Sequence, residues 1–244
     1  MPSSRPHTIP TVIGILKDLQ PQSILDVGVG FGKWGHLFRE YTDIVASEND
    51  PARYQKRNWK VRIDGIEGFE SYLTDMHRYI YDELHVGHAS EVIETLGNYD
   101  MIFMGDVIEH FEKQDGISFL DAAWKRANKA VVISTPWFDI EQLDICENDL
   151  ERHRSHWTPQ DFDAYGHVQA FKGDGDILIA VMTKPQVTPP RCQAPRPPGR
   201  LSTVVRNSAI RILGEKRFQQ IRSTLSDVDN VPSDGVEEPV GSNS

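Results

Sequence analysis

The spacing of apolar residues changes repeatedly between helix-like and strand-like along the first three quarters of the chain. Apolar side chains at helical spacing predict a helix over residues 9–20, which Pro21 ends, and a first strand begins near Ser23. The other expected helices cover residues 72–84, 90–96 and 117–127, and one more is expected to start at 158–161. The other expected strands cover residues 61–67, 85–89, 99–105, 130–134, 168–171 and 177–182. Strands that alternate with helices indicate a mostly parallel sheet with helices on both faces.

The last two expected strands differ from the others because only a short turn separates them. The segment Gly-Asp-Gly-Asp at residues 173–176 joins them in the manner of a hairpin, so they should run antiparallel. The sequence therefore predicts an α/β fold in which the mostly parallel sheet has one antiparallel edge strand.

The periodic pattern ends at Pro185. Prolines recur between residues 185 and 200 and predict a semi-rigid linker over 185–201. A basic amphipathic helix is expected over residues 202–225, and the acidic, polar composition of residues 226–244 predicts a disordered tail. Residues 1–184 would then form the one folded domain.

Composition narrows the class of protein. The chain has 244 residues, of which 39% are hydrophobic, its mean hydropathy is −0.45, and no apolar stretch is long enough to span a membrane. The formal net charge of −10 argues against broad nucleic-acid binding. Cys146 and Cys192 are the only cysteines, so neither a disulfide framework nor a thiolate zinc site is expected. The N-terminal residues have no apolar secretory segment, and these features together favour a cytoplasmic protein.

The segment with the clearest chemistry follows the first strand. There the apolar run ends in Asp26-x-Gly28-x-Gly30-x-Gly32, and a helix is expected to follow. Glycines permit a tight turn and let a ligand approach main-chain N–H groups, which predicts a nucleoside-containing cofactor. Gly30, Gly32 and Gly35 also fit the spacing of dinucleotide-binding proteins, so the glycines alone do not identify the cofactor.

The acid in front of the glycines favours one class of cofactor. Asp26 would repel a pyrophosphate, whereas its carboxylate can accept hydrogen bonds from an ammonium group. S-adenosylmethionine has an ammonium, a sulfonium and no phosphate. Asp26 therefore favours this cofactor over a nicotinamide dinucleotide, with an ordinary glycine-rich turn as the alternative that involves no ligand.

The chain resembles the class I S-adenosylmethionine-dependent methyltransferases, in particular their small-molecule branch. Residues 26–32, Asp-Val-Gly-Val-Gly-Phe-Gly, match the first motif of the family, and both Asp-Val-Ile-Glu-His-Phe at 106–111 and Ser-Thr-Pro at 134–136 resemble later ones. The resemblance covers residues 9–184. It implies a Rossmann-like, doubly wound, seven-stranded sheet, S-adenosyl-L-methionine as cofactor, and methyl transfer as the reaction.

The resemblance also implies cofactor contacts at the ends of the strands. In this family an acid that ends the second strand binds the ribose hydroxyls, and Glu67 is favoured over the acids at 48 and 50, with residues 43–59 as an insertion. The tripeptide Gly-His-Ala at 87–89 stands where the family often has Gly-Asp-Ala, so adenine would meet a neutral histidine ring or the alanine N–H. The expected cofactor-binding residues are Asp26, Gly28, Gly30, Gly32, Glu67, His88, Ala89 and Asp106.

Asp106 and His110 are the expected catalytic residues. Both follow the fourth strand, where ligands bind in open α/β sheets, and in the family this segment borders the methionine part of the cofactor and the acceptor. His110 can serve as a general base toward a hydroxyl. The alternative is that Glu109 and His110 only order the loop, while methyl transfer proceeds by proximity and orientation.

A metal-assisted reaction is a further alternative. The small-RNA 2′-hydroxyl methyltransferases combine an acid-x-x-Glu-His motif with a later histidine, and they bind a divalent metal. Asp106, Glu109, His110 and His153 stand at matching positions, with Asp in place of the family's Glu. Because the same residues occur in metal-free relatives, no metal site is assigned.

The loop after the fifth strand is the other expected part of the acceptor pocket. His153, His156 and Trp157 would form a lid, and Trp137 and Phe138 would line the pocket. We therefore expect methyl transfer to a small-molecule or glycan-like acceptor, at oxygen. The alternatives are a non-catalytic binding module, whose segment at 202–222 contacts a partner or a membrane surface, and a nicotinamide-dependent oxidoreductase.

Overall fold

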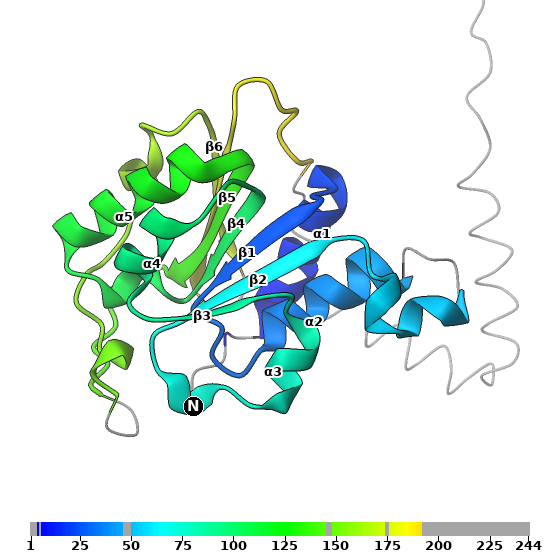
Figure 1. The fold of residues 1–244 in the computed structure, drawn as a ribbon. Helices are drawn as coiled ribbons and strands as arrows, with labels where there is room; N and C mark the ends of the chain where they lie inside the picture. Colours follow the sequence, from blue (N-terminus) through cyan, green and yellow to red (C-terminus); the bar gives the residue numbers. More distant parts are fainter. Residues whose placement is uncertain (1–3, 5, 46–49, 145–147, 174–175, 192–244) are drawn as a thin grey trace, which may run out of the picture. The chain divides into compact units, whose positions relative to one another are not determined.

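A seven-stranded sheet forms the centre of the computed structural model (Figure 1). The structure describes residues 4, 6–45, 50–144, 148–173 and 176–191. The strands lie side by side in the order β3-β2-β1-β4-β5-β7-β6. They are β1 (Ser23–Val27), β2 (Arg62–Glu67), β3 (Leu84–Val86), β4 (Tyr99–Gly105), β5 (Ala127–Pro136), β6 (His167–Gly173) and β7 (Ile177–Thr183).

The sheet is parallel except at β7. β1 pairs in parallel with both β2 and β4, which places it inside the parallel part. β7 is antiparallel to both of its neighbours, β5 and β6. The predicted Rossmann-like, mostly parallel sheet is therefore confirmed. Its antiparallel strand lies one place inside the edge, which β6 forms.

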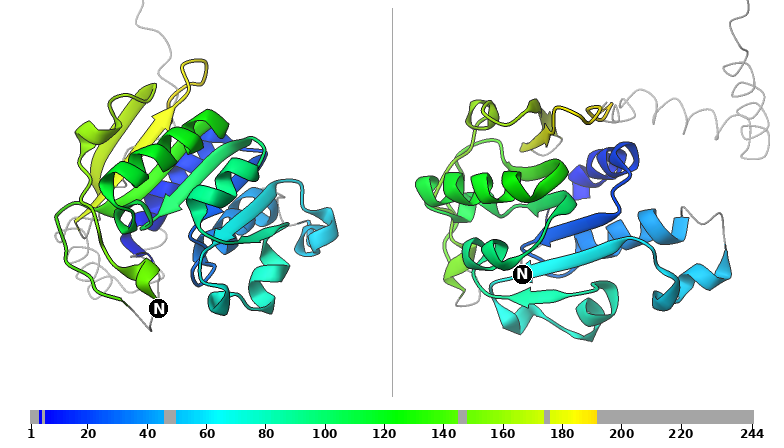
Figure 2. Two further views of the ribbon diagram at one scale, coloured as in Figure 1. Left: turned by 60° about the vertical axis from the view of Figure 1, so that its left-hand side comes forward. Right: turned by 45° about the horizontal axis from the view of Figure 1, so that its top comes forward.

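Helices cover both faces of the sheet (Figures 1 and 2). On one face Ile102 of β4 belongs to the same buried cluster as Phe119 of α5, and on the other Phe103 belongs to the cluster of Phe38 in α2. Because side chains alternate along a strand, consecutive residues of β4 enter opposite layers. The helices are α1 (Ile9–Leu19), α2 (Lys33–Arg39), α3 (Asp75–Ile80), α4 (Ala89–Thr95) and α5 (Lys113–Arg126).

The prediction of a long helix over residues 72–84 is wrong, because α3 is much shorter. The chain leaves the helix at Tyr81, whose side chain is buried and whose hydroxyl donates to Asp26 Oδ2 (2.5 Å). Asp82 then accepts the Ile63 N–H (2.8 Å) and directs the chain into β3. Burial of one tyrosine beneath the glycine turn thus overrides the helical periodicity.

α5 begins before its predicted start at residue 117. Gly116 lies inside the helix, where an added Cβ would lie only 2.6 Å from Trp157 Cζ2. Glycine has a low helix propensity, and the predicted start of the helix lies directly after Gly116. The close approach of the Trp157 ring is the reason for glycine at this position.

Residues 43–59, which we expect to be an insertion, contain short helical turns in their described part. Asp50 precedes the turn Pro51–Tyr54, and its side chain accepts the Ala52 N–H (3.0 Å). Asp50 therefore does not end a strand. The second strand ends at Glu67, as expected.

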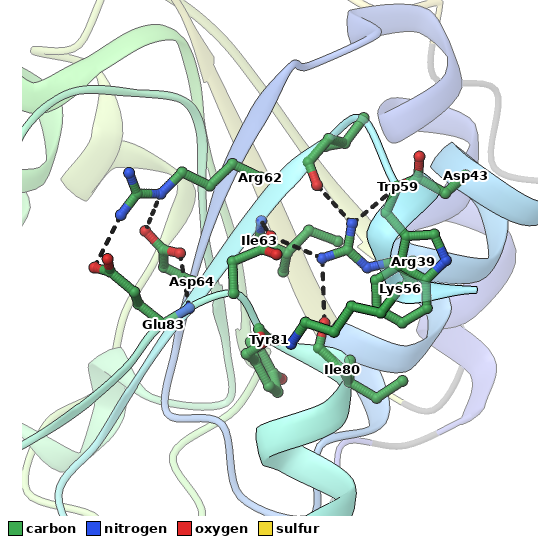
Figure 3. Close-up of polar contacts among 12 residues, drawn as sticks. Arg39, Asp43, Lys56, Trp59, Arg62, Ile63, Asp64, Ile80, Tyr81 and Glu83 are labelled. Atoms are coloured by element: carbon green, nitrogen blue, oxygen red, sulfur yellow. Dashed lines mark hydrogen bonds and ion pairs between the residues drawn. The ribbon is translucent and has the colours of Figure 1, made fainter. Parts of the chain in front are cut away.

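Arg39 of α2 connects this insertion to the sheet (Figure 3). Its buried guanidinium donates to Asp43 (2.8 Å), Asp82 (2.9 Å) and the carbonyl of Val61 (2.5 Å), and it lies 4.3 Å from the centre of the Trp59 ring. A buried cation with several charge-assisted bonds fixes its neighbours strongly. Arg39 therefore holds the start of β2 in place.

The described chain continues past the predicted domain end at residue 184. Val187 packs against the cluster that contains α1, and the Arg191 N–H donates to Asp18 (2.7 Å). These residues belong to a unit that spans residues 1–195. The predicted helix over 202–225, the predicted tail and both cysteines lie outside the described residues. Among the helices that the structure describes, none has the length and apolar character to cross a membrane.

Candidate functional site

A cavity of about 320 Å³ lies at the carboxyl ends of the parallel strands. Its wall comes from the turn after β1, the end of β2, the start of α4, the segment after β4 and the loop between β5 and β6. The strand order reverses here, between β1 and β4, and this is where open α/β sheets bind ligands. The predicted site residues that line the cavity are Gly28, Gly30, Glu67, His88, Ala89, Asp106 and His110.

The glycine turn has the conformation that its sequence predicts. Gly28, Gly30 and Gly32 have φ values of +73°, +53° and +82°, which residues other than glycine rarely adopt. A Cβ on Gly28 would lie 2.4 Å from Val107 Cγ2, so the turn packs directly on the segment after β4. Gly32 does not line the cavity. An added Cβ there would lie 2.9 Å from the His77 ring, so its role is to start α2.

Asp26 does not line the cavity either, and this corrects the expectation that it accepts a hydrogen bond directly from a cofactor ammonium. Its carboxyl group is buried beneath the glycine turn, where Oδ2 accepts from the Tyr81 hydroxyl. Oδ1 has no hydrogen-bond partner among the described residues. Burial raises the pKa of Asp26 to about 8, although the Tyr81 hydrogen bond acts in the opposite direction.

Glu67 connects the end of β2 to the glycine turn. Its Oε2 accepts the Gly30 N–H (2.7 Å), and its Oε1 accepts the Phe69 N–H (2.9 Å). Burial raises the pKa of Glu67, and these backbone bonds lower it. Two carboxylate oxygens thus lie in the cavity wall beside the turn, while the ribose contact of Glu67 stays a prediction.

His88 and Ala89 lie at the start of α4. His88 Nδ1 lies 2.7 Å from Ser90 Oγ, and its ring contacts Phe111 edge-on with the ring centres 5.4 Å apart. Both residues line the cavity, while their contact with adenine stays a prediction.

Asp106 follows β4 with a φ of +55°, which is unusual for a residue with a side chain. Its N–H donates to the Ser134 carbonyl (2.8 Å). Burial raises the pKa of Asp106, whereas a hydrogen bond with Ser4 and the charge of Lys33 lower it. The backbone thus turns sharply where the carboxylate enters the cavity wall.

Glu109, His110 and His153 form a cluster in the wall, with ligand atoms within 4.8 Å of one another. His110 Nδ1 lies 3.1 Å from the Arg152 carbonyl, and His153 Nδ1 lies 2.7 Å from the Ile140 carbonyl. A carbonyl only accepts, so each Nδ1 donates, and Nε2 is the ring atom of each histidine that remains for a ligand. Burial lowers the pKa of His110 to about 4.

The two carboxylate oxygens of Glu109 differ in their hydrogen bonding. Its Oε2 accepts from the Thr135 hydroxyl (2.9 Å), but Oε1 is buried and has no hydrogen-bond partner among the described residues. Burial raises the pKa of Glu109 well above its usual value, and the charge of Asp106 raises it further. The cluster therefore combines one carboxylate oxygen that has no donor among the described residues with two histidine rings whose Nδ1 atoms face carbonyls.

The loop between β5 and β6 contributes to the wall differently from what we expected. His153 lines the cavity, but Trp157 is completely buried and packs on Phe162, with the ring centres 5.7 Å apart. Its indole N–H donates to the Ile108 carbonyl (3.2 Å), so it supports the segment after β4 from beneath. His156, Trp137 and Phe138 do not line this cavity. His156 Nε2 lies 3.0 Å from the Trp137 carbonyl. Of the predicted lid, His153 lines this cavity, while His156 and Trp157 line a second, smaller cavity together with Phe138.

Sequence reasoning missed several residues of the wall. Lys33 directly follows the glycine motif, and Tyr72, Asn148 and Glu151 form a polar group in which Tyr72 donates to Glu151 Oε1 (3.2 Å). The signal for Lys33 was its position at the start of α2. The other three had no signal, because two segments remote in sequence bring them together.

A second cluster of the same residue types lies outside the cavity wall. Asp64, Glu83 and His85 also have ligand atoms within 4.8 Å of one another. Asp64 Oδ2 accepts from Arg62 (2.7 Å) and from the Tyr99 hydroxyl (2.6 Å), and Arg62 also contacts Glu83 (2.9 Å; Figure 3). An arginine thus occupies the space between the two carboxylates.

No protein-family model matches the sequence, and no curated protein matches it. Among solved structures, the chain is similar to the methyltransferase domain of bacterial CtHen1-C, with 18% identity, coverage of 73% of this chain and 97% of that one, and a TM-score of 0.49. It is also similar to the N-terminal domain of EvdMO1 in the presence of S-adenosylhomocysteine and D-fucose, with 14% identity, coverage of 75% and 84%, and a TM-score of 0.48. A third similar structure is magnesium protoporphyrin IX methyltransferase from Synechocystis with bound S-adenosylhomocysteine. Its identity is 11%, the match covers 72% of this chain and 82% of that one, and the TM-score is 0.46. The strand order and the antiparallel β7 are those of a class I methyltransferase fold, and the described part of the chain has this fold.

Proposed function

We propose that this protein is an S-adenosylmethionine-dependent methyltransferase that acts on a hydroxyl of a small-molecule or glycan-like acceptor. One observation carries the proposal: a left-handed glycine turn and the carboxylates of Glu67 and Asp106 border a single cavity. Such a turn allows close approach to the backbone, and carboxylates can accept from ribose hydroxyls and from an ammonium group. The location in the cytoplasm belongs to the same proposal.

The charge of the cavity wall supports a cationic ligand over a dinucleotide. Glu67, Asp106, Glu109 and Glu151 line the cavity, and among the described wall residues Lys33 is the one lysine or arginine. A wall with this excess of carboxyl groups suits a sulfonium and an ammonium, and it disfavours a diphosphate. The nicotinamide-dependent alternative is therefore weaker than the sequence alone suggested.

The residues of the chain have three tasks in this reaction. S-adenosylmethionine, when bound, supplies a methyl group on a sulfonium sulfur. The cavity wall must hold the acceptor oxygen in line with that carbon at about 3 Å and exclude water. As the oxygen–methyl bond forms and the methyl–sulfur bond breaks, S-adenosylhomocysteine leaves and the hydroxyl proton passes to an acceptor group.

His110 is the proposed acceptor group. Its Nδ1–H is engaged with the Arg152 carbonyl, so Nε2 has the free lone pair, and a pKa of about 4 keeps the ring neutral near pH 7. A ring of such low basicity is a weak general base. We therefore propose that His110 mainly orients the hydroxyl through a hydrogen bond and accepts its proton late.

A divalent cation held by Glu109, His110 and His153 is the second candidate. The specific observation in its favour is that both rings direct Nδ1–H to carbonyls, which leaves Nε2 for a ligand, and that Glu109 Oε1 has no hydrogen-bond partner among the described residues. Metal-binding histidines commonly donate their other N–H in this way. A cation at this place would lower the pKa of an acceptor hydroxyl and would extend the acceptor class to 2′-hydroxyls of RNA.

Calorimetric titration with S-adenosylhomocysteine tests the first proposal. We expect the full chain to bind it and expect NAD not to compete. Gly30→Val should abolish binding, because φ is +53° at this position. Gly14→Val on α1 is the matched control, since nothing lies within 4 Å of an added Cβ there. A folded wild-type protein that does not bind would overturn the proposal in favour of a non-catalytic module.

An acceptor screen separates the two candidates. Small hydroxylated molecules, glycans and short RNAs are incubated with S-adenosylmethionine and either Mn²⁺ or EDTA, and release of S-adenosylhomocysteine is measured. If a metal is used, chelation and His153→Ala should both abolish turnover while cofactor binding persists. Turnover that EDTA leaves unchanged would exclude the metal candidate.

A further inference from the structure

Lys33 is the cation of the cavity wall to which neither the family motif nor the proposed reaction assigns a role. It is the first residue of α2, directly after the glycine turn, and it lines the cavity with Ser4, Trp34 and Asp106. Its Nζ donates to the Ser4 carbonyl. The side chain therefore lies along the wall at this end of the cavity.

The surroundings of Lys33 are polar and fixed. The Trp34 indole N–H donates to Ser4 Oγ (2.9 Å), which holds the Ser4 backbone against α2. Burial lowers the pKa of Lys33 and raises that of Asp106, while the charge of each group acts on the pKa of the other in the opposite direction. A lysine and an aspartate thus line the same cavity, Lys33 from the start of α2 and Asp106 from the residue after β4.

This arrangement matches one part of the proposed cofactor. The amino-acid end of S-adenosylmethionine has an ammonium and a carboxylate on the same carbon. Glu67, beside the glycine turn, is the group placed for the ribose, and Asp106 offers an acceptor for the ammonium. The carboxylate then needs a donor, and a carboxylate is a stronger acceptor for a lysine ammonium than the Ser4 carbonyl is.

We propose that Lys33 binds the α-carboxylate of the cofactor and, paired with Asp106, makes the site selective for ligands that carry an amino-acid end. This inference rests on the proposed function. It assigns to Lys33 a positioning role: holding the carboxylate fixes the direction in which the sulfonium methyl points. Loss of this contact should weaken the cofactor and misalign the methyl group without affecting recognition of adenosine.

The test uses two ligands that differ only in the carboxylate. Binding of S-adenosylmethionine and of its decarboxylated form is measured by calorimetry for the full chain. We expect the wild-type protein to prefer the carboxylated ligand by about 10- to 100-fold, the range for one charge-assisted hydrogen bond. Lys33→Met should reduce this preference to about one, and Lys33→Arg should restore much of it.

Two controls separate the failure of this inference from other failures. Lys125→Met removes an exposed lysine of α5 and should keep the wild-type preference. 5′-Methylthioadenosine, which has no amino-acid end, should bind Lys33→Met and wild type equally. An unchanged preference in Lys33→Met, or an equal loss for all three ligands, would overturn the role of Lys33. Absence of binding by the wild-type protein would instead overturn the proposed function.

Discussion

The clusters Glu109–His110–His153 and Asp64–Glu83–His85 contain the same kinds of residue in different surroundings. Each brings carboxylate and imidazole atoms within 4.8 Å of one another. In the second, Arg62 contacts both carboxylates and Tyr99 donates to Asp64, so the oxygens already have strong partners. In the first, the histidines donate to backbone carbonyls and Glu109 Oε1 has no hydrogen-bond partner among the described residues.

This difference shows that residue types alone do not decide whether a cluster can bind a ligand or take part in a reaction. An arginine between two carboxylates makes a structural tie, since its fixed donors saturate the oxygens. Backbone carbonyls that accept only from Nδ1 have the opposite effect, because they orient the rings and leave the Nε2 lone pairs available. The first cluster also lines the cavity, whereas the second does not.

Replacing one histidine in each cluster should give the largest contrast. We expect His110→Ala to lower turnover about 100-fold or more, which is the lower part of the range for a group that handles the proton of the acceptor. His85→Ala should retain wild-type turnover. Release of S-adenosylhomocysteine with an acceptor from the screen measures both. Equal rates in the two variants would remove His110 from the mechanism.

A third buried carboxylate extends the comparison to pH. Asp26 accepts from a tyrosine hydroxyl, as Asp64 does, but it has no cation contact among the described residues, and burial raises its pKa to about 8 from 3.8. Between pH 4 and 8 the folded chain therefore holds a proton that the unfolded chain releases, so stability should fall as pH rises through this window.

Asp26→Asn should remove that pH dependence while its amide oxygen still accepts from Tyr81. Since one pKa unit corresponds to about 1.4 kcal/mol and the pKa of Asp26 rises from 3.8 to about 8, we expect the variant to gain about 5–6 kcal/mol over wild type between pH 4 and 8. Thermal unfolding across this range measures the gain. Asp163→Asn, at an exposed position, is the control. A stability difference that does not change with pH would contradict a protonated Asp26.

These contrasts also show how much the sequence could predict. The glycine turn and Glu67 were predicted because each depends on local features: positive φ at glycines and the end of an apolar strand. Trp157 was misplaced because its burial depends on Gly116, a contact between remote segments. Asp26 was expected in the cavity because nothing in its own segment indicates that Tyr81 covers it.

Replacement by the isosteric amide should affect the free energy of unfolding differently at Asp64 and at Glu109. Asp64 accepts with both oxygens, Oδ1 from the Glu83 N–H (3.1 Å) and Oδ2 from Arg62 and Tyr99. In Asp64→Asn the amide NH₂ must face a donor, and we expect a loss of about 1–3 kcal/mol. Glu109→Gln can place its NH₂ at the unused Oε1 position, so its stability should be unchanged or higher. Denaturation in urea measures both, and a larger loss for Glu109→Gln would reverse the comparison.

The smallest expected effect comes from removing one hydroxyl beside each cluster. Thr135 donates to Glu109 Oε2 (2.9 Å), and Tyr99 donates to Asp64 Oδ2 (2.6 Å), so Thr135→Val and Tyr99→Phe are matched variants. If the first cluster binds a divalent cation, Thr135→Val should weaken Mn²⁺ binding about tenfold, because a ligand that loses its orienting hydrogen bond is held less well. Tyr99→Phe should leave Mn²⁺ affinity unchanged, since Arg62 already neutralises Asp64. Titration of each variant with Mn²⁺ by electron paramagnetic resonance measures the affinities without requiring turnover. Equal weakening by both variants would mean that neither hydroxyl acts through a metal ligand, and the distinction between the clusters would then rest on the cavity alone.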